Sequence, residues 1–273
     1  MTYSNTAKSA LSPVILSSYP KSGRTWLRFI LANYINQTYN LNLDVDFWCL
    51  ITLVPNGGKD PKKGLPAYQL GDRPDIPLIL ATHGFWHQKF IERKVIWLIR
   101  SPADVLVSHY CHLSYSMGIY NNSISNFLQS PEQGLNRLIV YLNQWSQHLD
   151  ENKTRILSYE QMQSQPHGTL KALIEFIGMP WDKPALEYAI EAASFGKMRA
   201  IETKKGAPWL RVNQENSAAL RTRRGEVGSY HKHLSEEDII YIQQQCEAKL
   251  IPAAKQLLTE AGCQIITQTA STV

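Results

Sequence analysis

The sequence contains few cysteines and no long apolar run. Its cysteines, Cys49, Cys111, Cys246 and Cys263, lie far apart and form no CxxC pair, so neither a zinc site nor a disulfide framework is expected. Without a run of about 18 apolar residues, no transmembrane helix is expected either. The first ten residues are polar and lack the apolar core of a signal peptide. A reducing cytoplasm is therefore the expected location.

The phosphate-binding sequence of ordinary nucleoside triphosphatases, GxxxxGK followed by Ser or Thr, is also absent. The charge imbalance is small, because 28 Lys and Arg face 23 Asp and Glu, for a net charge of +5. This balance is less basic than in dedicated nucleic-acid-binding proteins and suits an anionic ligand. The histidine pairs His83/His87 and His109/His112 make a poor metal site, so no metal is expected.

The 273 residues, 44% of them hydrophobic, are enough for one large domain. We expect it to span 1–273, with flexible tails at 1–10 and 264–273. Short apolar runs predict strands at 13–19, 77–83, 94–100 and 155–160. Helical patterns follow at 24–35, after Ser101-Pro102, and at 133–150, 167–178, 235–249 and 251–261. This alternation predicts an α/β fold with a central parallel sheet and helices on both faces. Residues 52–76 and 196–233 are predicted to be irregular.

The segment that follows the first strand combines two cations, two hydroxyls and a glycine. Lys21, Ser22, Gly23, Arg24 and Thr25 precede or begin the first predicted helix. Free N–H groups at a helix N-terminus favour an anion, and glycine lets the backbone approach it closely. The alternative is an ordinary helix start with a solvated lysine.

Two further strand ends carry polar groups. His83 ends the second predicted strand, and a histidine there suits a general base near neutral pH. Arg100 ends the third strand, and Ser108 follows two helical turns, about 12 Å, later, too far for both to reach one atom by helix geometry alone. An arginine side chain that reaches forward could still share one phosphate with Ser108. The alternatives are a hydrogen-bonded structural histidine and a salt-bridged arginine. Because ligands of open α/β sheets bind beyond the carboxyl ends of the strands, the three segments point to one site.

Six segments together resemble the motifs of cytosolic-type sulfotransferases, which use 3′-phosphoadenosine 5′-phosphosulfate (PAPS). They occur in that family's order, between residues 13 and 235. The segments are YPKSGRTW, ATHGFW, VIWLIRSPADVLVSHY, RILSYEQM, ASFGKM and RRGEVGSYHKHLS. The resemblance implies a P-loop, nucleotide-kinase-like fold and the transfer of a sulfuryl group from PAPS to a hydroxyl, leaving 3′-phosphoadenosine 5′-phosphate (PAP).

The resemblance also implies a role for each matching residue. Three residues are implied to be catalytic: Lys21, His83 and Ser108. Lys21 contacts the transferring sulfuryl group, and His83 is the general base. The residues implied to bind the donor are Lys21, Ser22, Gly23, Arg24, Thr25, Trp26, Arg100, Ser108, Tyr159, Phe195, Arg223, Arg224 and Gly225. Arg100, Ser108 and the Arg223–Gly225 segment are assigned to the 3′-phosphate. Trp26, Tyr159 and Phe195 are assigned to the adenine.

Some residues depart from the family pattern. Arg24 stands where the family usually has threonine, and the family's short dimerisation motif is not recognisable in KHLSEEDII, so no dimer is inferred. The acceptor is expected to be a small, moderately apolar alcohol or phenol, in a pocket lined by 45–70, 84–90 and 112–125. The aromatics of these segments are Phe47, Trp48, Phe85, Trp86, Tyr115 and Tyr120, and they could equally be core. The alternative functions are a small-molecule kinase that uses ATP and magnesium, and a nucleotide-binding module without activity.

Overall fold

A computed structural model describes residues 13–57, 73–207 and 225–265. The expected tail 1–10, most of the tail 264–273, much of the loop 52–76, and Arg223 and Arg224 lie outside the described residues. Within the part of the chain described, no helix has the length and apolar character needed to cross a membrane.

Four parallel strands form the sheet, as the sequence predicts. They are β1 (Val14–Ser18), β2 (Ile79–Thr82), β3 (Val95–Ile99) and β4 (Thr154–Ser158), in the order β2-β1-β3-β4. In register, Ile15 lies opposite Leu80 on β2 and opposite Val95 on β3. Because all strands run in the same direction, their carboxyl ends lie at one edge of the sheet, where β1 and β3 are neighbours at its centre.

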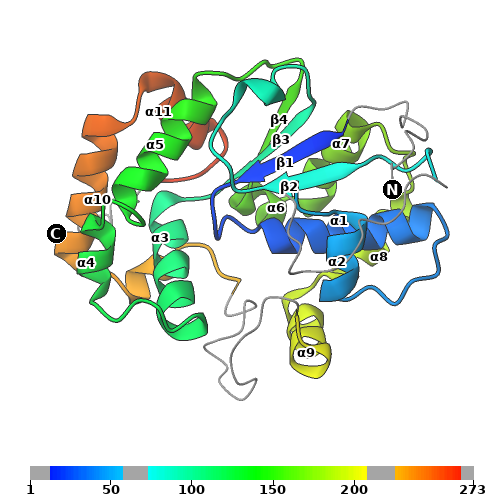
Figure 1. Ribbon diagram of the computed structural model, residues 1–273, viewed down its shortest axis with the longest axis horizontal. Coiled ribbons are helices and arrows are strands. Elements are labelled where there is room, and N and C mark those ends of the chain that lie inside the picture. Colours follow the sequence, from blue (N-terminus) through cyan, green and yellow to red (C-terminus); the bar gives the residue numbers. More distant parts are fainter. Residues whose placement is uncertain (1–12, 58–72, 208–224, 266–273) are drawn as a thin grey trace, which may run out of the picture.

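Helices cover both faces of the sheet, so the predicted fold class is confirmed. Alternate strand residues point to opposite sides: Val14 and Leu16 join one buried cluster, and Ile15 joins the other. Figure 1 shows the two groups of helices on opposite sides of the strands. The first group is α1 (Arg24–Thr38), α2 (Phe47–Leu53), α6 (Tyr159–Ser164), α7 (Pro166–Ile177), α8 (Lys183–Ala192) and α9 (Phe195–Lys205). The second is α3 (Pro102–Cys111), α4 (Ile124–Gln129), α5 (Leu135–Ser146), α10 (Glu236–Lys249) and α11 (Pro252–Glu260).

Local sequence explains where several helices begin and end. Ser158 and Gln161 form a reciprocal capping box that starts α6 directly at the end of β4. Ser235 and Asp238 do the same for α10. Helix α7 ends at Gly178, whose φ of 91° lies in the left-handed region that glycine adopts readily.

The structure corrects some expectations. Ser101 precedes α3, but its side chain does not cap that helix; its hydroxyl instead donates to the carbonyl of Gln264 at 2.9 Å. Residues 196–205, expected to be irregular, belong to α9, and 52–53 belong to α2. Helix α5 is shorter than the pattern at 133–150 suggests. Short helical turns complete the fold: η3 (Gln88–Phe90), the π-helical η4 (His112–Ser116) and η5 (Ser229–Lys232).

Candidate active site

A cavity of about 680 Å³ opens at the carboxyl ends of the strands. It collects most of the residues that the sequence singles out, from segments far apart in the chain. Those that line it are Lys21, Gly23, Arg24, Thr25, Trp26, His83, Arg100, Ser108, Tyr159, Phe195 and Gly225. Ser22 does not line it, and is only 1% exposed; its N–H donates to the carbonyl of Tyr19 at 3.3 Å.

The turn between β1 and α1 has an unusual backbone. Lys21 has a φ of 72° and Gly23, the N-cap of α1, a φ of 98°. The φ of Gly23 lies in the left-handed region that favours glycine. Glycine is also required because a Cβ atom at this position would lie 2.5 Å from Cδ2 of Tyr159. The first turn of α1 therefore packs directly on the Tyr159 ring, with its N-terminal N–H groups beside the cavity.

Tyr159, at the start of α6, joins three parts of the cavity wall. Its ring centroid lies 5.2 Å from that of Trp26. The Arg100 guanidinium lies over its face, 4.1 Å from the centroid. Burial raises the pKa of its hydroxyl, although the charge of Arg100 acts in the opposite direction. Trp26 is fixed in turn by a 3.1 Å hydrogen bond from its Nε1 to the carbonyl of Ala193.

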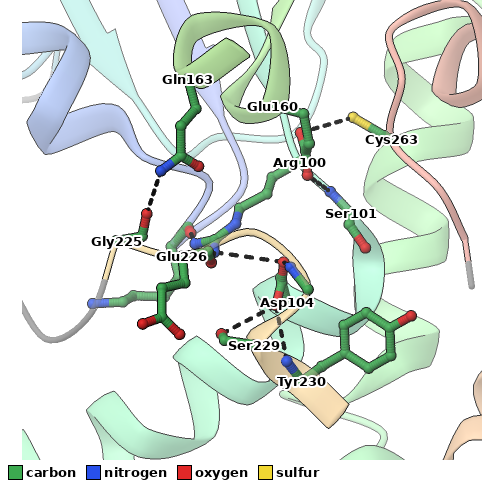
Figure 2. A network of polar contacts seen from close by, with 12 residues as sticks. Arg100, Ser101, Asp104, Glu160, Gln163, Gly225, Glu226, Ser229, Tyr230 and Cys263 are labelled. Atoms are coloured by element: carbon green, nitrogen blue, oxygen red, sulfur yellow. Dashed lines mark hydrogen bonds and ion pairs between the residues drawn. The ribbon is translucent and has the colours of Figure 1, made fainter. Parts of the chain in front are cut away.

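Arg100 is almost enclosed, with 9% of its side chain exposed. Its Nη1 donates to the carbonyl of Lys21 at 3.4 Å and its Nη2 to the carbonyl of Glu226 at 3.0 Å. The carboxylate of Asp104, one helical turn further on, lies 3.7 Å from Nη2. Figure 2 shows the guanidinium between Asp104 and Glu226. The Nε atom of Arg100 is buried and has no hydrogen-bond partner among the described residues.

Asp104 is a site residue that the sequence reasoning missed. It is fully buried and accepts hydrogen bonds from the backbone of Gly228 at 2.7 Å and of Tyr230 at 3.1 Å, and from the hydroxyl of Ser229 at 3.3 Å (Figure 2). It thereby fixes the segment that follows Gly225 against α3. An acidic residue one turn after a strand-terminal arginine was the available signal in the sequence.

His83 lies beside the end of β1. Its Nδ1 is 2.7 Å from the carbonyl oxygen of Ser18, which can only accept, so Nδ1 carries a proton and donates. In the neutral ring, Nε2 is then the nitrogen with the lone pair. His83 is exposed to the cavity that it lines, so this geometry suits proton abstraction.

The residues that line the cavity for an acceptor differ from those expected from the sequence. None of the six aromatics named for the acceptor pocket is among the described residues that line this cavity. Phe47 is fully buried in the core, and Trp86 stacks on His148 with centroids 3.8 Å apart. The expected segments contribute other residues to the cavity lining: Asn56, His112, Leu113 and Met117. His109, from α3, lines the cavity as well.

Charge at this wall is shaped by burial. The pKa of His109 falls to about 4, first because it is buried and then because Lys21 and Arg137 are positive. Burial also raises the pKa of Tyr19, whose ring contacts that of His109, to about 12. Among the described residues, no group of three or more side chains is arranged to hold a metal ion.

Comparison with known proteins identifies the family. A family model described as the sulfotransferase domain matches residues 11–254. The chain belongs to the sulfotransferase family. Among its relatives, flavonol 3-sulfotransferase of Flaveria bidentis is 26% identical over 271 residues, covering 90% of this sulfotransferase and 84% of that protein. Cytosolic sulfotransferase 1 of Arabidopsis thaliana is 26% identical over 263 residues, covering 87% and 78%.

Solved structures show the same fold. Mouse sulfotransferase SULT7A1 in complex with PAP has a TM-score of 0.65 at 16% identity, with 94% of this sulfotransferase and 90% of that chain covered. Retinol dehydratase in a complex with retinol and PAP has a TM-score of 0.60 at 17% identity, with 94% and 84% covered.

Proposed function

We propose that the protein transfers a sulfuryl group from PAPS to the hydroxyl of a small, moderately apolar acceptor, with His83 as the general base. The observation that carries this proposal is the combination of Lys21, Arg100 and His83 in one cavity. Two cations from different strand ends suit a donor with two separated anionic groups, and the histidine suits the activation of a hydroxyl. Membership of the sulfotransferase family supports the same reaction.

The cavity fits the donor. Its volume of about 680 Å³ lies within the usual range for small-molecule sites. Lys21, Thr25 and the N-terminal N–H groups of α1 would hold the 5′-phosphosulfate. Arg100 and Ser108 both line the cavity, as their assignment to the 3′-phosphate requires.

The remaining donor contacts follow the sequence assignment. Trp26, Tyr159 and Phe195 would contact the adenine, since they form the aromatic part of the wall. Ser22 is assigned to the donor by the resemblance alone, because its side chain is buried and its N–H bonds the carbonyl of Tyr19. Arg223 and Arg224, outside the described residues, remain assigned to the 3′-phosphate with Gly225.

When bound, PAPS supplies the sulfuryl group and a phosphate leaving group. His83 accepts the proton of the attacking hydroxyl at Nε2, while the hydrogen bond from Nδ1 to Ser18 holds the ring in that orientation. Such general-base catalysis is worth about 10²–10⁴-fold in rate. Lys21 and the N–H groups of α1 stabilise the negative charge that develops on the leaving oxygen.

The proposed class of acceptor rests on apolar residues in the cavity lining. Leu113 and Met117 line the cavity together with His112, and Glu226 is the one acidic residue among the described residues of the lining. This lining favours an apolar alcohol or phenol over a highly charged saccharide. The name of the Flaveria relative, a flavonol 3-sulfotransferase, agrees with a small hydroxylated acceptor. The names of the cytosolic relatives support the proposed cytoplasmic location.

Thermal denaturation with nucleotides tests the donor. PAP in the presence of a metal chelator is expected to raise the melting temperature, because fixed cations hold its phosphates. ATP with magnesium is expected to raise it less. A larger shift with ATP and magnesium would favour a small-molecule kinase instead and would contradict the proposal. Incubation of hydroxylated metabolites with radiolabelled PAPS then identifies the acceptor.

A further inference from the structure

His109 lines the cavity but has no part in the donor contacts or in the base assigned above. It follows Ser108 on α3, and its ring is held edge-on by two aromatic rings. The ring centroid lies 6.0 Å from that of Tyr19 at an interplanar angle of 87°, and 5.5 Å from that of Phe127 at 90°. These contacts restrict the imidazole to one plane.

The two nitrogens of this ring lie in different surroundings. Nδ1 is buried, and no described residue offers it a hydrogen bond. A buried N–H group without an acceptor is rarer than a buried acceptor without a donor, so the proton belongs on Nε2. Because Nδ1 points into the protein and the residue lines the cavity, Nε2–H is the group that the ring offers to a ligand.

The charges near His109 indicate which ligand atom this N–H meets. Burial lowers the pKa of the ring to about 4, and the positive charges of Lys21 and Arg137 oppose its protonation further. The imidazole is therefore neutral at physiological pH and acts as a hydrogen-bond donor without adding a buried charge. Its ring contact with Tyr19, two residues before Lys21, assigns it to the reacting end of the cavity.

We infer that Nε2–H of His109 donates a hydrogen bond to a sulfuryl oxygen of the donor and holds that group for in-line attack. The inference rests on the proposed function, because it concerns the group that PAPS carries and PAP lacks. It also gives the histidine next to Ser108 a role distinct from that of the base, His83.

Calorimetric binding of PAPS and PAP tests the inference without an acceptor. His109→Phe keeps an aromatic ring beside Tyr19 and Phe127 but removes the N–H. It is expected to raise the Kd of PAPS about tenfold to a hundredfold, the usual effect of losing a hydrogen bond to a charged group. The Kd of PAP should stay within about twofold. His109→Gln, whose amide can donate from a similar position, is expected to restore most of the PAPS affinity.

The matched control is His167→Phe, which changes an exposed histidine on α7 and should alter neither Kd. Equal losses for PAPS and PAP in His109→Phe, or no loss for either, would overturn the inference and leave the proposed function intact. Wild-type protein that binds neither ligand would overturn the proposed function itself. Should His109→Phe fail to fold, nitrogen-15 NMR of the wild type decides: we expect the Nε2-protonated tautomer, and the Nδ1-protonated form would contradict us.

Discussion

Replacing Gly23 with alanine tests how closely the β1–α1 turn packs on Tyr159. The new Cβ would lie 2.5 Å from Cδ2 of the tyrosine, about 1.0–1.5 Å closer than an ordinary carbon–carbon contact of about 3.5–4.0 Å. Relieving such overpacking costs about 1–3 kcal/mol. The φ of 98° adds about 1–2 kcal/mol for a residue with a side chain. The free energy of unfolding should therefore fall by about 2–5 kcal/mol.

Gly178→Ala separates the two contributions. Gly178 has a similar φ of 91°, but a Cβ atom there would meet nothing within 4 Å. It lies at the end of α7, outside the cavity lining, so this variant should show only the backbone cost and bind PAP normally. Gly23→Ala should also weaken PAP more than about tenfold, since a displaced turn loses at least one N–H contact to phosphate.

Urea denaturation and calorimetry with PAP measure both effects. If Gly23→Ala unfolds at the same urea concentration as Gly178→Ala and binds PAP as tightly as the wild type, the turn does not depend on this contact. The reasoning about the glycine would then be wrong.

The remaining predictions concern three side chains of the cavity. His83→Ala should lower kcat by about 10²–10⁴-fold while leaving the Kd of PAP within about twofold; near-normal kcat with a saturating acceptor would refute the base assignment. Arg100→Ala should weaken PAPS far more than adenosine 5′-phosphosulfate, which has no 3′-phosphate, and equal losses measured by calorimetry would reject the assignment. Folding lowers the pKa of His109 from its ordinary 6.5 to about 4. Between pH 4 and pH 6.5 this histidine is therefore protonated in the unfolded chain and neutral in the folded protein. Stability should be unaffected by this group above pH 6.5 and should fall by up to about 3 kcal/mol as the pH drops towards 4, because each pKa unit corresponds to about 1.4 kcal/mol. His109→Gln should remove this part of the decline in urea titrations, and an unchanged decline would contradict the assignment.

The sheet and much of the cavity could be predicted because they depend on local patterns. Short apolar runs mark buried strands, and parallel strands bring their carboxyl ends to one edge. That rule alone brought Lys21, His83 and Arg100 together, and all three line the cavity. Their assigned roles remain predictions until they are tested.

Residues whose importance comes from long-range packing could not be predicted. Asp104 matters because a segment 124–126 positions later in the chain folds over it. The state of His109 depends on burial and on charges from two other elements. The sequence also assigned residues to the acceptor pocket that do not line it. Residue type alone could not show that the aromatic ring of Phe47 is buried in the core.

The position of Tyr159 constrains how this cavity can be re-engineered or can diverge. Its ring leaves no room for a side chain at position 23, and Gly225 would approach Phe195 to 3.1 Å if it carried a Cβ atom. Positions 23 and 159 should therefore covary in evolution, with any larger residue at 23 accompanied by a smaller one at 159. A chimera whose transplanted β1–α1 turn carries a side chain at position 23 should fail unless residue 159 is made smaller and the backbone at position 23 leaves its φ of 98°.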